Sequence, residues 1–302
     1  MNPADNAFGF QWHITGRCHG KCRHCYQSAA DGAPELPVDA LKRIADGIML
    51  AVSGPVTINV TGGEPLMYQS HAMNHGVFEL MSHLSTFGNL DELNIITTAQ
   101  GLDNSIIRAL KSIPKLSYVK VSLESHDPQI NDSIRGSGHY SMAVDGIRQL
   151  AKSGLQVIIM ATLSKRNCQS VSGLCSLAED LGTHGVIFER FVPLGRGLID
   201  MRDETVSPKE WREILTAISA VTQAPTEDLS PYKAFWVDGD SVSGAPCCLG
   251  PSSMALMPGG TVYPCRRVPN PIGKLPGDGM DAILKKLEEY ASVPQQCFDF
   301  GG

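Results

Sequence analysis

The sequence predicts an α/β protein with a parallel sheet, and two observations support this class. Six apolar runs rich in β-branched residues alternate with six segments of helical periodicity up to about residue 223. Such strict alternation is typical of parallel strands joined by helical crossovers. The chain has 302 residues, 42% of them hydrophobic. It can therefore bury one large domain, or a large domain and a small one.

The elements follow from these patterns in order. The last of the six helical segments begins with Ser207 and Pro208, which suit the N-cap and the first helical position. Gly154 follows the fourth helical segment, at the C-terminal position where a residue in the left-handed conformation is expected. Six units are too few for a closed eight-stranded barrel, which leaves a curled partial barrel or a flat doubly wound sheet. The expected strands are 8–15, 55–62, 92–99, 116–124, 156–163 and 185–193, and the expected helices 38–52, 76–88, 104–113, 141–154, 170–182 and 207–223.

The last eighty residues have a different pattern. Periodicity disappears over 224–246, which we expect to be a linker or covering loop. Two short apolar runs separated by Pro258, Gly259 and Gly260 then predict a β-hairpin. A last helical segment covers 278–293.

Composition excludes some partners. The net charge is -6 and no basic stripe is present, so we expect neither nucleic acid nor an anionic membrane surface as a partner. The first residues carry no signal-peptide pattern, and no apolar run approaches the roughly 18 residues of a membrane span. These features predict a cytoplasmic protein.

Nine cysteines in a cytoplasmic protein are expected to be metal ligands or reactive thiols, because the cytosol keeps thiols reduced. Their placement suggests two metal sites. The front group is Cys18, Cys22 and Cys25; the rear group is Cys247, Cys248, Cys265 and Cys297; Cys168 and Cys175 stand between.

Three thiols in the front group allow two interpretations. A zinc site would need a fourth ligand, which His19 or His24 could supply. A [4Fe-4S] cluster held by three cysteines instead leaves one iron open to a substrate or cofactor. The spacing alone leaves both open.

A second motif follows the second strand. Gly62 and Gly63 let the backbone approach a ligand, and Glu64 can accept hydrogen bonds from an ammonium group; an ordinary glycine-rich turn is the alternative. Together the two motifs, C-x3-C-x2-C followed by the aromatic Tyr26 and the GGEP run that ends at Pro65, resemble the radical S-adenosylmethionine (radical SAM) superfamily.

The resemblance implies a partial (β/α)6 TIM-like barrel and a chemistry. The three front cysteines would hold a [4Fe-4S] cluster whose open iron binds S-adenosylmethionine, with Gly62, Gly63 and Glu64 on its amino group. A low-potential donor such as flavodoxin or ferredoxin would supply one electron. Reductive cleavage would then give a 5′-deoxyadenosyl radical that abstracts a substrate hydrogen atom.

The fourth strand adds three candidates. Ser122 offers a hydroxyl for a ribose or carboxylate, and Arg135 offers a planar fork for a carboxylate. By resemblance, Ser122, Glu124 and Arg135 look like S-adenosylmethionine contacts of the peptide-modifying branch. For Glu124 and Arg135, a surface ion pair is the alternative.

The rear cysteines resemble the SPASM and twitch auxiliary-cluster domains. That resemblance implies one auxiliary [4Fe-4S] cluster on Cys248, Cys265 and Cys297, with Cys247 or a non-cysteine group as fourth ligand. Tetrahedral zinc on the same residues is the alternative. The expected domains are the barrel over 8–223, the linker over 224–246 and the auxiliary-cluster domain, a hairpin plus helix, over 247–302.

The remaining candidates have a functional and a structural interpretation each. Cys168 follows the fifth strand and is a candidate hydrogen-atom donor, or a helix-start cysteine; Cys175 fits a helix core. His71, His75 and Glu79 could form a metal site or a solvated helix face. Arg190 and Arg196 could contact a substrate carboxylate or form structural salt bridges.

For the substrate, the stretch from Ser122 to Leu150 resembles enzymes that modify ribosomally made peptides. We therefore expect epimerisation, thioether formation or carbon–carbon cross-linking of a peptide. Because the chain begins at the first strand, without a peptide-recognition segment, a small-molecule dehydrogenase or cyclase in cofactor or natural-product biosynthesis is the second hypothesis. A non-catalytic zinc-binding scaffold is the third.

Overall fold

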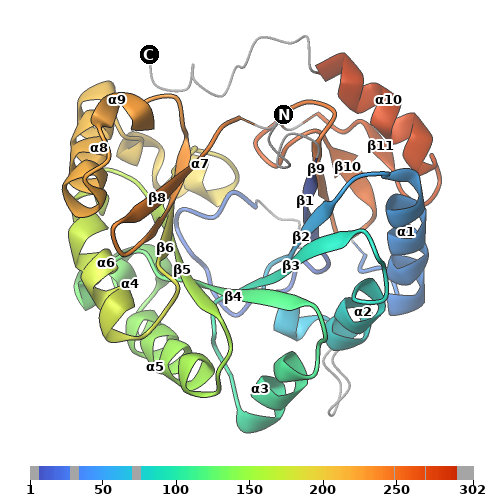
Figure 1. Cartoon of the computed structure of the whole chain (residues 1–302), viewed down its shortest axis with the longest axis horizontal. Helices are drawn as coiled ribbons and strands as arrows, with labels where there is room; N and C mark the ends of the chain where they lie inside the picture. The colour runs from blue at the N-terminus through green and yellow to red at the C-terminus, as the bar shows by residue number, and fades with distance from the viewer. Residues whose placement is uncertain (1–6, 28–33, 70–75, 248, 269, 291–302) are drawn as a thin grey trace.

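The computed structural model of the chain describes residues 7–27, 34–69, 76–247, 249–268 and 270–290. Within these ranges eleven strands form one sheet, in the order β11-β10-β9-β1-β2-β3-β4-β5-β6-β7-β8. The sheet is strongly curved, as Figure 1 shows, so the partial barrel is confirmed against the flat alternative. Its first six strands are parallel neighbours in chain order: β1 (Phe8–His13), β2 (Val56–Thr61), β3 (Leu90–Thr97), β4 (Leu116–Ser122), β5 (Val157–Leu163) and β6 (Val186–Arg190).

The helices lie on the outer face of the curved sheet (Figure 1). All six helices expected from the periodicity are present: α1 (Val38–Ala51), α2 (Gly76–Leu84), α3 (Asn104–Lys111), α5 (His139–Lys152), α6 (Val171–Asp180) and α8 (Pro208–Thr222). The pattern does not predict α4 (Pro128–Arg135), because only Asn131 and Ile134 of this short helix are buried. No helix in the described ranges is long and apolar enough to cross a bilayer.

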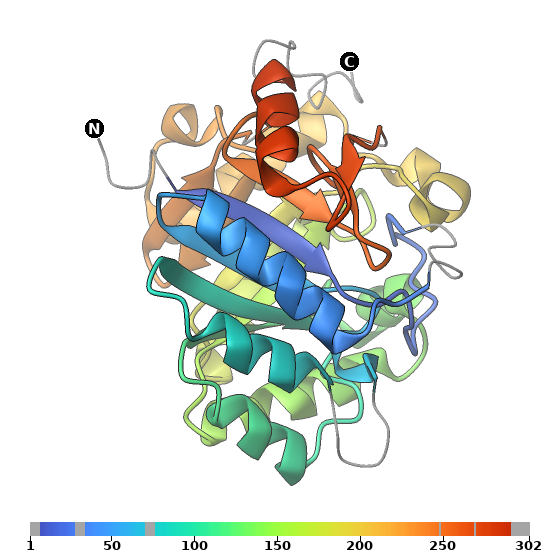
Figure 2. The same cartoon turned by 90° about the vertical axis from the view of Figure 1, so that its right-hand side faces the viewer.

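The core fills the space between the sheet and these helices. In β1 the side chains of Phe8, Phe10 and Trp12 are buried, and β2 repeats the pattern in register beside it. Period-two burial of this kind turns one strand face toward the helices. Figure 2 shows α1 and α2 lying along the outside of these strands, and α1 buries the apolar side that includes Ile44 and Ile48.

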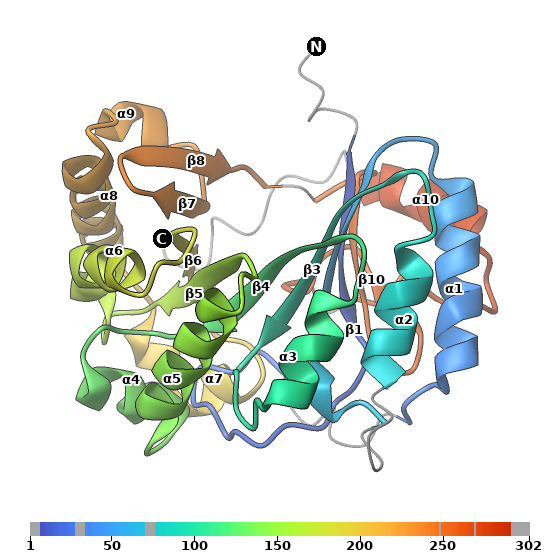
Figure 3. The ribbon, with the colours of Figure 1, turned by 60° about the horizontal axis from the view of Figure 1, so that its bottom comes forward.

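The segment 224–246 is not a plain linker. It contains the short helix α9 (Thr226–Leu229) and the hairpin of β7 (Ala234–Asp238) and β8 (Ser241–Ala245), and β7 pairs antiparallel with β6. These strands extend the sheet beyond the sixth unit, as Figure 3 shows. The polar alternation of β8 and the shortness of both strands hide them from a periodicity search.

The C-terminal hairpin extends the other edge of the sheet. Strand β9 (Ser253–Leu256) pairs parallel with β1, and β10 (Thr261–Tyr263) pairs antiparallel with β9 across the predicted glycine turn. A Cβ on Gly260 would lie 2.1 Å from the backbone oxygen of Leu275, so the turn excludes other residues. The edge ends with β11 (Gly273–Lys274) and α10 (Met280–Tyr290); the rest of the predicted last helix lies outside the described residues.

Candidate functional site

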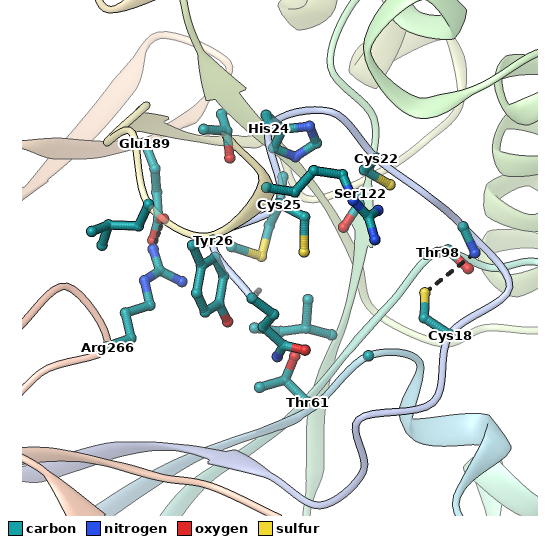
Figure 4. Close-up of a pocket in the computed structure, with 18 of the residues that line it drawn as sticks. Cys18, Cys22, His24, Cys25, Tyr26, Thr61, Thr98, Ser122, Glu189 and Arg266 are labelled. Carbon is teal, nitrogen blue, oxygen red and sulfur yellow. Dashed lines mark hydrogen bonds and ion pairs between the residues drawn. The ribbon is translucent and has the colours of Figure 1, made fainter. Parts of the chain in front are cut away.

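A cavity of about 180 Å³ lies where the carboxyl ends of the parallel strands converge. Its walls come from segments far apart in the sequence, which the topology brings to one end of the sheet. Figure 4 shows side chains from the loop after β1 facing side chains from β2, β4 and β6. The walls are residues 16–27 in part, Thr61 to Gly63, Ile96 to Thr98, Ser122, Arg135, Met160, Thr162, Glu189 to Val192, Leu194, Arg196, Arg266 and Arg267.

All three front thiols line this cavity. A Cβ on Gly20 would lie 3.3 Å from the Cys22 sulfur and 3.9 Å from the Cys18 sulfur, so Gly20 lies close beside both thiols. Burial raises the pKa of Cys18 to about 11, and burial likewise raises the pKa of Cys25. Metal binding would therefore release protons from these thiols.

The donor set fits an iron–sulfur cluster better than zinc. Three thiolates suit a cluster with one open iron. Of the two histidines that could complete a zinc site, His19 is exposed, and His24 has its Nε2 atom 3.3 Å from Glu124 while its Nδ1 atom has no hydrogen-bond partner among the described residues. In the described part of the chain, no three His, Cys, Asp or Glu side chains are arranged to hold a metal ion.

The glycine pair holds the cysteine loop in place. The backbone N–H of Gly63 donates to the oxygen of Thr15 at 2.8 Å, and that of Glu64 donates to the oxygen of Arg17 at 2.7 Å. A Cβ on Gly63 would lie 2.1 Å from the Arg17 oxygen. The close approach that requires glycine is thus to the base of the cysteine loop, which continues the β1–β2 pairing toward Cys18.

Glu64 does not line the cavity and is completely buried. Its carboxylate accepts hydrogen bonds from the Thr97 hydroxyl at 2.7 Å, from the Thr98 hydroxyl at 2.7 Å and from the Thr98 backbone N–H at 2.8 Å. These contacts tie the end of β2 to the end of β3. Pro65 is buried too, at the start of a short 3-10 helix, and is absent from the cavity wall.

Ser122 and Arg135 line the cavity, and Glu124 lies behind Arg135. The Nε atom of Arg135 donates to Glu124 at 2.8 Å, and the backbone N–H of Thr162 donates to the other carboxylate oxygen at 2.6 Å. Glu124 is completely buried, so the interpretation of Glu124 and Arg135 as a surface ion pair is wrong. Burial alone would raise the pKa of Glu124, but the charges of Arg135 and His24 outweigh it and lower that pKa.

Tyr26 belongs to a buried network that the sequence did not reveal. The Gln27 amide nitrogen lies 3.0 Å from the Gly62 oxygen and 2.8 Å from Nδ1 of His13. A carbonyl oxygen only accepts, so the amide donates to both atoms, and the proton of neutral His13 resides on Nε2. That nitrogen lies 3.2 Å from the Tyr26 hydroxyl. Burial, followed by the charge of Arg266, lowers the pKa of His13 to about 3.

The opposite wall carries positive charge from the C-terminal segment. Arg266 pairs with Glu189 of β6, donates to the Gln11 side chain at 3.1 Å and lies 5.2 Å from the ring centroid of Tyr26. Figure 4 shows Arg266 between Glu189 and Tyr26. Burial alone would raise the pKa of Glu189, but Arg266 and Arg267 lower it. Their position directly after Cys265 is the one signal that the sequence contained for them.

Of the other sequence candidates, Arg190 and Arg196 line the cavity and the following do not. Cys168 is buried under α6 and α8, its thiol donates to the Lys165 oxygen at 3.3 Å, and it does not line the cavity. Cys175 is buried in the apolar core, as expected. Cys247 and Cys265 are half-buried and do not line the cavity. The residues Cys248, Cys297, His71 and His75 lie outside the described ranges, and Glu79 pairs with Lys42.

Comparisons with known proteins identify relatives. A model of the radical SAM superfamily matches residues 12–171, more than half of the chain. The Fe-coproporphyrin III synthase of Methanosarcina barkeri is 28% identical over 232 residues, which are 75% of this chain and 54% of that protein. The antilisterial bacteriocin subtilosin biosynthesis protein AlbA of Bacillus subtilis is 23% identical over 277 residues, which are 90% of this chain and 58% of AlbA.

A solved structure has the same fold. Streptococcus suis SuiB bound to its precursor peptide SuiA superposes with a TM-score of 0.67 at 14% identity, over 86% of this chain and 59% of SuiB. The likeness at this identity concerns the fold alone. The chain spans a little over half the length of the two curated relatives.

Proposed function

The chain belongs to the radical SAM superfamily, and on that premise we propose that it cleaves S-adenosylmethionine reductively in order to modify a ribosomally made peptide. The observation that carries this proposal is the single cavity lined by Cys18, Cys22 and Cys25 together with Ser122 and Arg135. Soft ligands for iron and polar groups for a zwitterionic cofactor thus share one space.

The three front cysteines would hold the [4Fe-4S] cluster. When bound, the cluster and S-adenosylmethionine supply a 5′-deoxyadenosyl radical that abstracts a hydrogen atom from the substrate. The protein would hold these groups at the carboxyl ends of the parallel strands. An electron would come from a low-potential donor such as flavodoxin or ferredoxin.

Side chains on the walls would orient S-adenosylmethionine. Arg135, fixed by the buried Glu124, presents its guanidinium group at the cavity for a carboxylate, and Ser122 presents a hydroxyl. The side chain of Glu64 is engaged with Thr97 and Thr98, so the amino group would meet the backbone of Gly62 and Gly63. Tyr26, held through His13, closes another side.

A peptide is the substrate class that the relatives favour. AlbA takes part in the biosynthesis of a bacteriocin, and SuiB was solved with a precursor peptide. The second candidate is a small-molecule enzyme of cofactor biosynthesis, which the similarity to Fe-coproporphyrin III synthase favours. Incubation with reductant, S-adenosylmethionine and a peptide encoded beside the gene separates the two, because only the first predicts a mass change in the peptide.

The rear cysteines would hold one auxiliary [4Fe-4S] cluster. Cys265 follows β10 and Cys247 follows β8, and Cys248 and Cys297 complete the proposed set. Cys265 adjoins Arg266, which touches the ring of Tyr26, so this region lies next to the front cluster loop. Tetrahedral zinc is the competing occupant.

The experiment is iron and sulfide analysis after anaerobic reconstitution, with 5′-deoxyadenosine formation measured alongside. We expect about eight irons in the parent and about four in the Cys18→Ala/Cys22→Ala/Cys25→Ala variant, with cleavage lost only in the variant. About four irons in the parent and almost none in the variant would contradict the proposed auxiliary cluster. No cleavage by a parent that holds iron would overturn the proposed reaction and favour a metal-binding scaffold.

A further inference from the structure

The cavity is strongly basic although the chain is acidic. Five arginines line it, and Glu189 is the one carboxylate among the described lining residues. The whole chain has a net charge of -6. A cavity whose charge opposes that of its protein attracts ligands of the opposite sign.

Three of the five arginines have evident structural partners. Arg135 pairs with the buried Glu124, and Arg266 pairs with Glu189. The guanidinium carbon of Arg190 lies 5.7 Å from the ring centroid of Trp211 on α8. These contacts account for their positions without a ligand.

Arg196 and Arg267 are different. Arg196 is half-buried at the start of α7 (Arg196–Asp200) and lines the cavity. Its charge interacts with the Cys25 thiol, and no carboxylate of the described residues pairs with it. The next N–H, that of Gly197, donates to the Cys25 oxygen at 3.0 Å and so fixes this end of α7 against the cysteine loop.

Arg267 reaches the cavity from the C-terminal segment that follows β10. Its Nη2 atom donates to the Arg190 oxygen at 3.3 Å and lies 3.7 Å from Glu189, which already pairs with Arg266. Only 10% of the Arg267 side chain is exposed. One carboxylate therefore serves two largely buried guanidinium groups.

The cofactor would not balance this charge. A [4Fe-4S] core held by three thiolates carries roughly one net negative charge. S-adenosylmethionine adds a carboxylate, but its sulfonium is positive. With Glu124 and Glu189 both counted against the five arginines, positive charge remains in the loaded cavity.

We infer that the substrate presents a carboxylate to Arg196 and Arg267, which both line the cavity. This inference rests on the proposed function and narrows its substrate class to peptides with an acidic side chain, or a free C-terminal carboxylate, near the modified residue. Arginine suits this task because its planar fork binds a carboxylate through two parallel hydrogen bonds.

The test is selection of peptides by the reconstituted holoenzyme with S-adenosylmethionine bound. A randomised pool of synthetic nonapeptides is passed over the immobilised protein, and the retained peptides are sequenced by mass spectrometry. Two forms of the pool, with free and with amidated C-termini, distinguish the two sources of the carboxylate. The matched proteins are Arg196→Gln/Arg267→Gln, Arg196→Glu/Arg267→Glu, and Arg108→Gln/Arg212→Gln, which removes two exposed arginines outside the cavity.

We expect the parent to enrich Asp and Glu over Asn and Gln, or free over amidated C-termini, by about tenfold. The cavity Gln variant loses the enrichment, the cavity Glu variant enriches Lys and Arg instead, and the surface variant behaves like the parent. Equal enrichment of acids and amides by the parent would overturn the inference, as would an unchanged preference in the cavity Gln variant.

Two further measurements distinguish failure of this inference from failure of the proposed reaction. Affinity for S-adenosylmethionine is expected to stay within about threefold in the cavity Gln variant; its loss would show that the arginines serve the cofactor and would overturn the inference. Formation of 5′-deoxyadenosine without any acid preference would sink the inference and leave the proposed reaction standing. Acid preference without 5′-deoxyadenosine would sink the proposed reaction alone.

Discussion

Glu124 is the residue on which the polar contacts behind the cavity converge. It accepts from Arg135 and from the Thr162 backbone, and His24 lies beside it. Removing one partner of a buried ion pair leaves the other charge uncompensated, which is costly. Arg135 thereby depends on Glu124 for both its position and its charge balance.

We expect Glu124→Gln to lower the free energy of unfolding by about 3 kcal/mol, because Arg135 would stay buried without a counterion. Urea denaturation of the metal-free protein measures this. The control is Glu204→Gln, which breaks the more exposed pair with Arg166 and is expected to cost about 0.5 kcal/mol. Similar losses in both variants would contradict the buried network.

Gly63 gives a second prediction at this scale. In Gly63→Ala the new Cβ would meet the Arg17 oxygen, so the cysteine loop must shift. Reconstituted iron in the front site is expected to fall by more than half, as measured in a variant whose Cys247, Cys248, Cys265 and Cys297 are replaced by alanine. In the same background, Gly47→Ala on α1 meets no atom within 4 Å and should leave iron unchanged. Full iron retention by Gly63→Ala would refute a role in placing the loop.

Among the elements, α8 has the most complete N-terminus. The Ser207 hydroxyl accepts from the Glu210 N–H, and the Glu210 carboxylate accepts from the Ser207 N–H at 2.7 Å, with Pro208 at the first position. This capping box satisfies two N–H groups that a helix otherwise leaves without partners. The sequence therefore defines where α8 begins, and α8 in turn carries Trp211 and packs against the turn that contains Cys168.

Ser207→Ala is expected to lower the free energy of unfolding by about 1 kcal/mol, because it removes one half of the box. Thermal or urea unfolding measures the loss. Thr216→Ala, in the same helix, removes only a hydroxyl bonded to the preceding turn and is expected to change stability by less than about 0.5 kcal/mol. A Ser207→Ala protein as stable as the Thr216→Ala protein would be incompatible with this role of the cap.

Across the whole molecule, Arg266 joins the C-terminal hairpin to β6, which lies on the far side of β1 to β5 in the curved sheet. It follows the C-terminal hairpin beside β1 and pairs with Glu189 on β6. Arg267 adds a second, longer contact to the same carboxylate. Arg266 and Glu189 both line the cavity, and their ion pair connects the rear cysteine segment with the barrel.

This pair predicts a pH dependence. The pKa of Glu189 is lower in the folded protein, because Arg266 and Arg267 outweigh its burial. Its stabilisation is therefore present above the ordinary carboxyl pKa of about 4.3 and is lost as the pH falls through the lower folded value. We expect Glu189→Gln to be less stable than the parent at pH 7, with the difference shrinking below about pH 4.

Hydrogen exchange of the backbone amides in β9 and β10 tests whether the Arg266–Glu189 ion pair holds the C-terminal hairpin in place. At pH 7 it should be faster in Glu189→Gln than in the parent. The exposed Glu227→Gln serves as the control and should match the parent. A stability difference between parent and Glu189→Gln that stays constant from pH 7 to pH 3 would argue against the ion pair.

The sequence by itself determined the alternation of strands and helices, the family and the three front thiols. These features are local: period-two and period-3.6 burial and the spacing of cysteines are legible in short windows. Other features cannot be predicted from short windows of sequence. They are the contact of Gly63 with the cysteine loop, the roles of Glu64 and Glu124, and the sheet pairing of 224–246. Each depends on at least one partner that lies outside its own strand or helix, from Arg135 for Glu124 to Arg17 for Gly63.

Only the tertiary structure decided which polar residues face the cavity. Cys168 and Ser122 each follow or end a parallel strand, yet Ser122 lines the cavity and Cys168 turns under α6 and α8. Arg196 and Arg267 line one cavity because β9 pairs with β1 and brings the C-terminal segment across to β6. Strand order and curvature set that juxtaposition, and no pattern within a single segment encodes it.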